Sequence, residues 1–151
     1  MPTAIKTTSE SIDFQKLVAL LDETLKIKDG ADHDFYSQYN KLDTINNVVV
    51  CYQDDIAIGC GAFKEFNSNT VEIKRMFVHP DFRGKGIASK VLKELELWAN
   101  ELNYTGCVLE TGKNNPEAIA LYNKSGYEII PNYGQYENIE TSVCLKKTFD
   151  K

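Results

Sequence analysis

The chain has 151 residues, of which 42% are hydrophobic and 26% charged, a composition typical of one folded domain rather than a disordered chain. Its 22 acidic and 17 basic residues give a formal net charge of −5 at pH 7, which argues against nucleic acid as a partner, because that binding relies on neutralising phosphates. No apolar run approaches the roughly 20 residues of a membrane-spanning helix, and residues 1–10 lack the apolar centre of a signal peptide. We therefore expect one domain over residues 1–151, in the cytoplasm, that binds neither nucleic acid nor membrane.

The first half of the chain predicts two helices set among strands. Apolar residues recur at helical spacing before Gly30, namely Phe14, Leu17, Val18, Leu21 and Leu25. Two apolar runs on either side of Asp54-Asp55 predict a hairpin. The predicted elements are a short strand at 4–7, the helix that ends near Gly30, a second short helix at 31–40, and strands at 48–52, 56–63 and 71–78.

The second half of the chain alternates between strand and helix. Its widest apolar stripe predicts a long helix, and a proline and a glycine at the two ends of a shorter stretch predict another. The alternation indicates parallel pairing within a mixed sheet that helices cover, an α/β fold class. The predicted elements are a helix at 86–102, a strand at 107–111, a helix at 116–124 and strands near 127–130 and 139–147.

The cysteines and histidines do not form a metal-binding pattern. The four cysteines (Cys51, Cys60, Cys107 and Cys144) are widely spaced without a C-x-x-C pair, and the two histidines lie far apart. We expect buried thiols rather than disulfides or a zinc site. A covalent acyl-enzyme is not expected either, because no cysteine has a histidine or a motif beside it.

A glycine-rich connection joins the strand at 71–78 to the long helix. It reads Arg83-Gly84-Lys85-Gly86-Ile87-Ala88. Glycine lets a ligand approach the backbone, the first N–H groups of a helix lack intrahelical partners, and two cations add charge, so the stretch is suited to hold a pyrophosphate. A dinucleotide-binding turn fits poorly, because Ser89 stands at the third glycine position and His79 to Arg83 intervene after the strand. The P-loop pattern is absent, and a loop that only starts a helix is the remaining alternative.

Two motifs together resemble the GNAT acyltransferase superfamily. Arg83-x-x-Gly86-x-Ala88 is similar to its pyrophosphate loop, Q/R-x-x-G-x-G/A. Further along, Asn115-x-x-Ala118-Ile119-x-Leu121-Tyr122-x-x-x-Gly126-Tyr127 is similar to its signature N-x-x-A-I/L-x-L/F-Y-x-x-x-G-F/Y. Residues 72–78, 109–112 and 132–136 look like those of bacterial small-molecule members. The resemblance implies a GNAT fold, with a central mixed sheet of about six or seven strands flanked by about four helices.

The same resemblance implies a cosubstrate and the residues that hold it. The chain would bind acetyl-CoA and move its acetyl group to an amine by direct transfer in a ternary complex, without a metal. Backbone groups of a strand would hold the pantetheine arm, the glycine-rich loop would hold the pyrophosphate, and Asn115 would touch the pantetheine from the other side. The strand residues are Met76, Phe77 and Val78, and the loop residues are Arg83, Gly84, Lys85, Gly86, Ile87, Ala88 and Ser89.

Tyr122 matches the family's tyrosine near the thioester sulfur. A CoA thiolate that resembles an ordinary thiol, with a pKa of about 8.5, benefits from a proton donor when it leaves. The Tyr122 hydroxyl can supply that proton. The alternative is a core aromatic on an amphipathic helix, since Ile119 and Leu121 are its neighbours.

Glu72 and Glu110 are the two candidate bases. An alkyl amine with a pKa near 10.4 is mostly protonated at pH 7, so a proton must leave before attack. Glu72 begins the strand expected to carry the pantetheine, where some family members keep a catalytic glutamate. Glu110 stands in an otherwise apolar strand, where an unpaired carboxylate would be costly. The alternative for each is an ion pair, with Lys74, Arg75 or Lys113 as partners.

Arg75 and two tyrosine-containing segments are candidates for binding the acceptor. Arg75 interrupts an apolar alternation, which fits either a carboxylate binder or a structural salt bridge. The segments at 31–40 and 131–136 are expected to line the acceptor pocket, with solvated surface as the alternative. Their candidate lining residues are Asp32, His33, Tyr36, Tyr133 and Tyr136.

Three functions remain open on the sequence alone. They are acetylation of a small-molecule amine, which the resemblance favours, acetylation of a protein or peptide, and a non-catalytic acyl-CoA sensor. Retention of Tyr122 speaks against the sensor. A homodimer is an open expectation.

Overall fold

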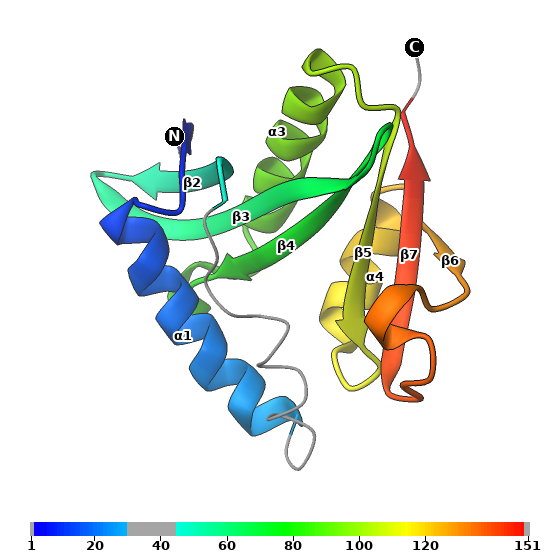
Figure 1. Ribbon diagram of the computed structural model, residues 1–151. Helices are drawn as coiled ribbons and strands as arrows, with labels where there is room; N and C mark the ends of the chain where they lie inside the picture. The colour runs from blue at the N-terminus through cyan, green and yellow to red at the C-terminus, as the bar shows by residue number, and fades with distance from the viewer. Residues whose placement is uncertain (1, 30–44, 150–151) are drawn as a thin grey trace.

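The computed structural model describes residues 2–29 and 45–149, and the side chains of 25–29 are left aside (Figure 1). The expected helix at 31–40 lies outside the described residues. The described elements are β1 (Thr3–Thr7), α1 (Ile12–Asp29), β2 (Asn47–Gln53), β3 (Ile56–Asn67), β4 (Thr70–Val78), the 3-10 helix η2 (Pro80–Phe82), α3 (Ile87–Glu101), β5 (Gly106–Gly112), α4 (Pro116–Lys124), β6 (Glu128–Ile130), the 3-10 helix η3 (Gly134–Tyr136) and β7 (Ser142–Thr148).

Seven strands form one mixed sheet in the order β1-β2-β3-β4-β5-β7-β6. The pairing of β4 with β5 is parallel, and every other neighbouring pair is antiparallel. This confirms the predicted fold class, with a parallel pair inside a mixed sheet. The predicted hairpin is also present, because Asp54 and Asp55 both have a positive φ that suits a tight turn between β2 and β3.

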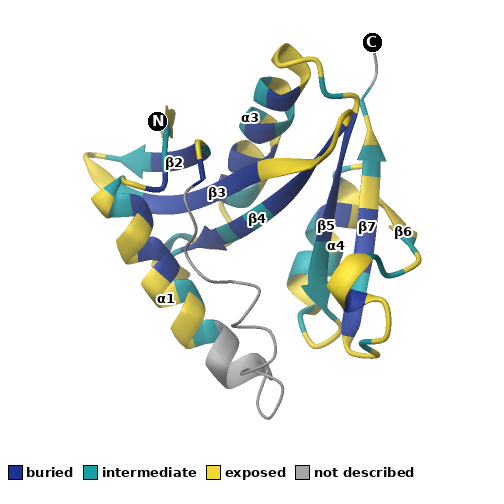
Figure 2. Ribbon diagram, in the orientation of Figure 1, coloured by how far each residue is buried: buried dark blue, intermediate teal, exposed yellow. Residues whose placement is uncertain are grey.

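Helices cover both faces of the sheet. Side chains alternate along a strand, so Val49 of β2 packs in the cluster that contains the buried face of α3, whereas Val48 and Val50 pack in the cluster that contains α1. On β7, Leu145 belongs to the α3 cluster and its neighbour Cys144 packs with Tyr136 of η3. We call the side covered by α3 and α4 the α3 face, and the side covered by α1 and η3 the α1 face. The central strands between them are mostly buried (Figure 2).

β4 and β5 pair over three residues and then separate. Their register joins Thr70 to Gly106 and ends where Glu72 meets Val108, while β4 continues to Val78. Figure 1 shows the two strands diverging beyond this point. Within the described chain, the edge of β4 that faces β5 therefore has no strand partner from residue 73 onward, and its main-chain groups are available to a ligand.

A bulge shapes the unpaired part of β4. Lys74 pairs with Ala62 of β3 and Phe77 pairs with Cys60, so Arg75 and Met76 together oppose Gly61. Arg75 has a φ of 62°, a left-handed conformation that is uncommon for a residue other than glycine. The bulge turns the Arg75 side chain toward α1, where it is 2% exposed.

Candidate active site

The glycine-rich loop presents open main-chain groups at the start of α3. Gly84 and Gly86 both have a φ of 78°, which L side chains rarely adopt, and a Cβ added at either would meet no atom within 4 Å. Gly86 is the N-cap, and the first helical bond joins the Lys90 N–H to the Gly86 carbonyl. The N–H groups before Lys90 therefore lie free at the positive end of the helix dipole. An open concave backbone of this kind fits the pyrophosphate of CoA.

The two cations of the loop, Arg83 and Lys85, contact the residues that precede it. The Arg83 Nε donates to the Val78 carbonyl at 3.0 Å, and the Arg83 guanidinium lies 5.6 Å from the centre of the Phe77 ring. The Lys85 ammonium lies 5.5 Å from the centre of the Phe82 ring. The Arg83 contacts connect the loop to the segment from Met76 to Val78, whose edge has no strand partner within the described chain. The sequence-predicted strand and loop residues are therefore adjacent in space.

Tyr122 and Asn115 come from α4, on the α3 face. The Tyr122 side chain is 6% exposed and packs edge-on against Tyr127, with ring centres 5.6 Å apart. Burial raises the pKa of Tyr122 above its ordinary value of 10.0, and the nearby Cys107 and Glu110 raise it further, so the hydroxyl stays protonated and can donate. The Asn115 Oδ1 accepts from the Ala118 N–H at 3.3 Å and caps α4. Its expected contact with pantetheine stays a prediction.

Glu72 lies on the α1 face, at the point where β4 and β5 separate. Its neighbours Val71 and Ile73 pack on the α3 face, so its own side chain takes the opposite direction, where it is 6% exposed. The Tyr133 hydroxyl donates to Glu72 Oε2 at 2.8 Å. Burial and the Glu72 charge raise the pKa of Tyr133, which keeps its proton and holds the carboxylate in place.

Aromatic rings surround the Glu72 carboxylate. The Tyr133 ring packs edge-on against Phe66 at 4.9 Å and against Tyr136 at 5.9 Å, measured between ring centres. Tyr136 is 2% exposed, so it is a wall of this site and not a solvated surface residue. Of the expected lining residues, Tyr133 and Tyr136 therefore lie beside a candidate base. Asp32, His33 and Tyr36 lie outside the described residues.

Glu110 lies on the same face as Glu72, one strand away. It is opposite Cys144 in the β5–β7 register, and its Oε2 accepts from the Ser142 hydroxyl at 2.6 Å. Burial lowers the pKa of Lys74, while the charges of Glu72 and Glu110 partly offset that effect. A partly buried cluster of Glu72, Lys74 and Glu110 thus lies on β4 and β5, and both candidate bases belong to it.

Arg75 has a structural partner. Its Nη1 lies 3.3 Å from Asp22 Oδ1 of α1, which is the salt bridge that the sequence left open as the alternative to carboxylate binding. Sequence reasoning missed both this pair and the bond from Ser142 to Glu110. The members of these pairs lie 53 and 32 residues apart in the sequence, and local sequence patterns do not predict contacts over such separations.

The described residues contain neither a metal-binding cluster nor a membrane-spanning helix. Within residues 2–29 and 45–149, no cluster of three or more His, Cys, Asp or Glu is arranged to hold a metal ion. None of the helices in that part of the chain combines the length and the apolar character needed to cross a membrane.

Comparison with known proteins agrees with the motifs. Residues 14–127 match the model of the acetyltransferase (GNAT) family. An IAA acetyltransferase of Azospirillum brasilense is 32% identical over 100 residues, which cover 66% of this chain and 65% of that protein. The chain spans between 50% and 65% of the length of the first two curated relatives it matches.

Solved structures share the fold over nearly the whole chain. A Klebsiella pneumoniae protein assigned to the acyl-CoA N-acyltransferases is 25% identical with a TM-score of 0.81, and the match covers 98% of this chain and 97% of that one. A GNAT family acetyltransferase of Elizabethkingia anophelis, solved with acetyl-CoA bound, has a TM-score of 0.72 at 20% identity, with 98% of each chain covered.

Proposed function

Since the chain belongs to the acetyltransferase (GNAT) family, we propose that it is an N-acetyltransferase that moves the acetyl group of acetyl-CoA to the amine of a small molecule. The observation that carries this proposal is the separation of β4 from β5 beside the glycine-rich loop. The separation leaves the edge of β4 without a strand partner, within the described chain, near the N-terminus of α3. A proton donor, Tyr122, lies on one face of the sheet there, and a carboxylate, Glu72, lies on the other.

Main-chain groups would hold the cosubstrate. The free N–H groups at the start of α3 would bind the pyrophosphate, with Arg83 and Lys85 adding positive charge. The unpaired edge from Met76 to Val78 would bind the pantetheine as an added strand would. Acetyl-CoA bound in this way supplies the acetyl group as a thioester. The Elizabethkingia anophelis protein, which shares this fold, was solved with acetyl-CoA bound, and this supports acetyl-CoA as the proposed cosubstrate.

The chain's own residues would move two protons. Glu72 would take a proton from the acceptor ammonium, directly or through a water, because an amine attacks only when its lone pair is free. The amine nitrogen then forms the bond to the acetyl carbon as the carbon–sulfur bond breaks. Tyr122 would give its proton to the leaving sulfur, and its raised pKa keeps that proton available at neutral pH. Glu110 would orient the site through Ser142.

A small-molecule acceptor fits the walls of the site on the α1 face. Glu72 is 6% exposed and accepts from Tyr133, which packs against Tyr136, so an acceptor must bring its amine to a buried carboxylate beside aromatic rings. A flat peptide-binding surface would leave the base more open. Acetylation of a protein or peptide, and acyl-CoA sensing without transfer, are the two rivals.

Binding and transfer are tested separately. Acetyl-CoA and CoA should raise the melting temperature in proportion to dose, because a ligand of the folded state stabilises it, and NADH should not. Thiol release should then be followed with acetyl-CoA against amino acids, polyamines, aminoglycosides and peptides. Release with one small amine class supports the proposal. Release with peptides alone supports the first rival, and binding without any release supports the sensor.

A further inference from the structure

The end of α4 ties Tyr122 to the residue that follows the helix. Gly126 has a φ of 95°, its N–H donates to the Asn123 carbonyl at 3.2 Å, and the Tyr127 N–H donates to the Tyr122 carbonyl at 3.0 Å. This pair of bonds is the Schellman motif, in which a left-handed glycine reverses the chain after a helix. Tyr127 is thereby held to Tyr122 through the main chain as well as through ring packing at 5.6 Å.

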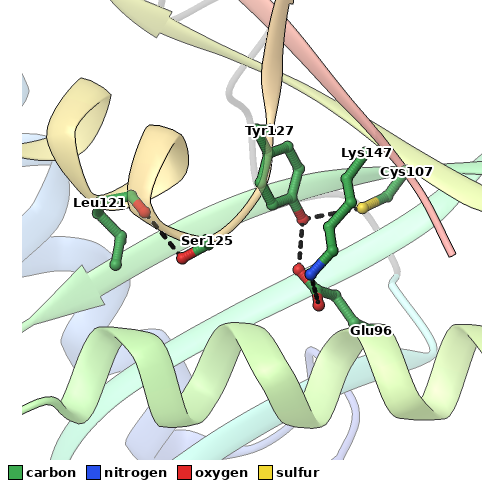
Figure 3. Close-up of polar contacts among 6 residues, drawn as sticks. All are labelled: Glu96, Cys107, Leu121, Ser125, Tyr127 and Lys147. Carbon is green, nitrogen blue, oxygen red and sulfur yellow. Dashed lines mark hydrogen bonds and ion pairs between the residues drawn. The ribbon is translucent and has the colours of Figure 1, made fainter. Parts of the chain in front are cut away.

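The Tyr127 hydroxyl lies at the centre of a polar network that joins three other elements (Figure 3). It donates to Glu96 Oε2 of α3 at 2.8 Å, and the Cys107 Sγ of β5 lies 2.9 Å from it. The Lys147 Nζ of β7 donates to the second oxygen of Glu96 at 2.8 Å. Glu96 therefore receives one bond on each carboxylate oxygen, and its charge is matched by Lys147.

The protons in this network can be assigned from chemistry. A tyrosine hydroxyl has one proton, and Tyr127 gives it to the Glu96 carboxylate, which only accepts. The Cys107 thiol must then donate to the Tyr127 oxygen. Burial raises the pKa of Cys107 to about 12 and raises that of Tyr127 as well, so both groups keep these protons at neutral pH. Each of the four side chains has a hydrogen-bond partner within the network, which makes the network rigid.

The Tyr122 hydroxyl has no such anchor. Within residues 2–29 and 45–149, no side chain or main-chain group forms a hydrogen bond to it. Its position is thus set by α4 and by its packing against a neighbour. That neighbour is Tyr127, whose hydroxyl is held by Glu96 and Cys107 and whose ring lies 5.9 Å from the Lys147 ammonium.

We propose that Tyr127 is a positioning residue for the transfer reaction: its hydroxyl network with Glu96, Cys107 and Lys147 holds the Tyr122 ring where it can protonate the leaving sulfur. This rests on the proposed function, in which Tyr122 is the acid. Because Glu96 belongs to α3, the helix that begins at the glycine-rich loop, the network also fixes the acid relative to the helix that would bind the pyrophosphate.

The test is a double-mutant cycle. Tyr127→Phe keeps the ring against Tyr122 and removes only the hydroxyl, so it should lower kcat by about fivefold, because small displacements of a reacting group are costly, while KM for acetyl-CoA stays near the parental value. In a Tyr122→Phe background the same change should have almost no further effect on kcat, since the group it positions is gone.

A matched control separates positioning from general stability. The Tyr104 hydroxyl donates to a carboxylate, Glu65 Oε1, at the same 2.8 Å, but this bond is exposed to solvent. Tyr104→Phe should leave kcat unchanged. If Tyr127→Phe does not fold, Glu96→Gln serves instead, because it keeps the size of the side chain and removes the charge that Lys147 matches; a smaller loss of kcat is then expected.

Three results would overturn the proposal. The first is a parental kcat for Tyr127→Phe while Tyr122→Phe is impaired, which removes the positioning role and leaves the acid in place. The second is an equal effect of Tyr127→Phe with and without the Tyr122 hydroxyl, which would mean that it acts elsewhere. The third is a parental kcat for Tyr122→Phe itself, which removes the acid and the positioning role together.

Discussion

On the α3 face, the groups that would bind acetyl-CoA are main-chain groups of two short stretches, the edge of β4 and the loop that starts α3. On the α1 face, the groups that would bind the acceptor are side chains from β4, β5 and the segment before β7. Main-chain geometry can be encoded by a short motif, because a few glycines keep it whatever the other side chains are. A site built from side chains of separate strands depends instead on the order of the strands in the sheet. The donor side is thus fixed by a motif, and the acceptor side by tertiary contacts.

The largest expected effect is on the α1 face. Glu72→Gln keeps the shape of the side chain and its bond to Tyr133 but removes the base, so kcat at pH 7 should fall by about 100-fold. The rate should recover partly at high pH, where the amine loses its proton without help. A pH–rate profile checks this. Glu110→Gln is the matched comparison and should lose less turnover, because Glu110 is expected only to orient the site through Ser142; a larger loss there than at Glu72 would move the base to β5.

The next effect is on the α3 face, at the proton donor. Tyr122→Phe keeps the ring and its packing against Tyr127, so the fold and the affinity for acetyl-CoA should survive. The turnover number should fall about tenfold or more, since the leaving sulfur loses its acid. Steady-state kinetics with a saturating acceptor measure this. Turnover at the parental rate would make Tyr122 a packing residue and leave water as the proton source.

A third effect separates main-chain from side-chain recognition. Gly86→Ala places a methyl group in the open space of the loop and strains a residue with a φ of 78°, so the dissociation constant for acetyl-CoA should rise about tenfold. Gly134→Ala is the control, because it carries a comparable left-handed strain at a φ of 51° with equally open space, but on the α1 face. It should leave that constant unchanged. Equal weakening by both would point to a general loss of structure.

The smallest effect compares the buried thiols of the two faces. Burial raises the pKa of Cys107, on the α3 face, to about 12, and that of Cys144, on the α1 face, to about 11, from 9.0. A thiol with a raised pKa stabilises the folded state fully below pH 9 and loses that contribution as the pH rises toward the folded value. The melting temperature should therefore fall between pH 9 and pH 11. Cys107→Ala should lessen the fall more than Cys144→Ala; identical curves for the parent and both variants would contradict this.

The sequence predicted the α3 face well because its signals are local. The positive φ at Gly84 and Gly86, the helix start at Ile87 and the glycine after α4 all follow from residues a few positions apart. The bond from Arg83 to the Val78 carbonyl also joins residues only five apart, although it was not predicted from the sequence. Turns and helix caps can be predicted from residues only a few positions apart in the sequence.

The α1 face was predicted only as a set of candidates. Glu72 and Tyr133 were both named, but the bond between them joins residues 61 apart and depends on the order of strands in the sheet. The β4 bulge that sends Arg75 to Asp22 depends on the register with β3, which alternation alone did not reveal. The network around Tyr127 was missed for the same reason, because Glu96, Cys107 and Lys147 meet it from three separate elements.

A calorimetric titration of acetyl-CoA into the parent, Gly86→Ala and Glu72→Gln proteins tests the central claim, that the α3 face holds acetyl-CoA and the α1 face supplies the base that activates the acceptor. We predict saturable binding by the parent and by Glu72→Gln with the same dissociation constant, although Glu72→Gln has lost its turnover, and weaker binding by Gly86→Ala. An absence of binding by the parent at millimolar acetyl-CoA would contradict the account at its root. Loss of binding in Glu72→Gln equal to that in Gly86→Ala would show that the α1 face takes part in holding the cosubstrate and that the division is wrong.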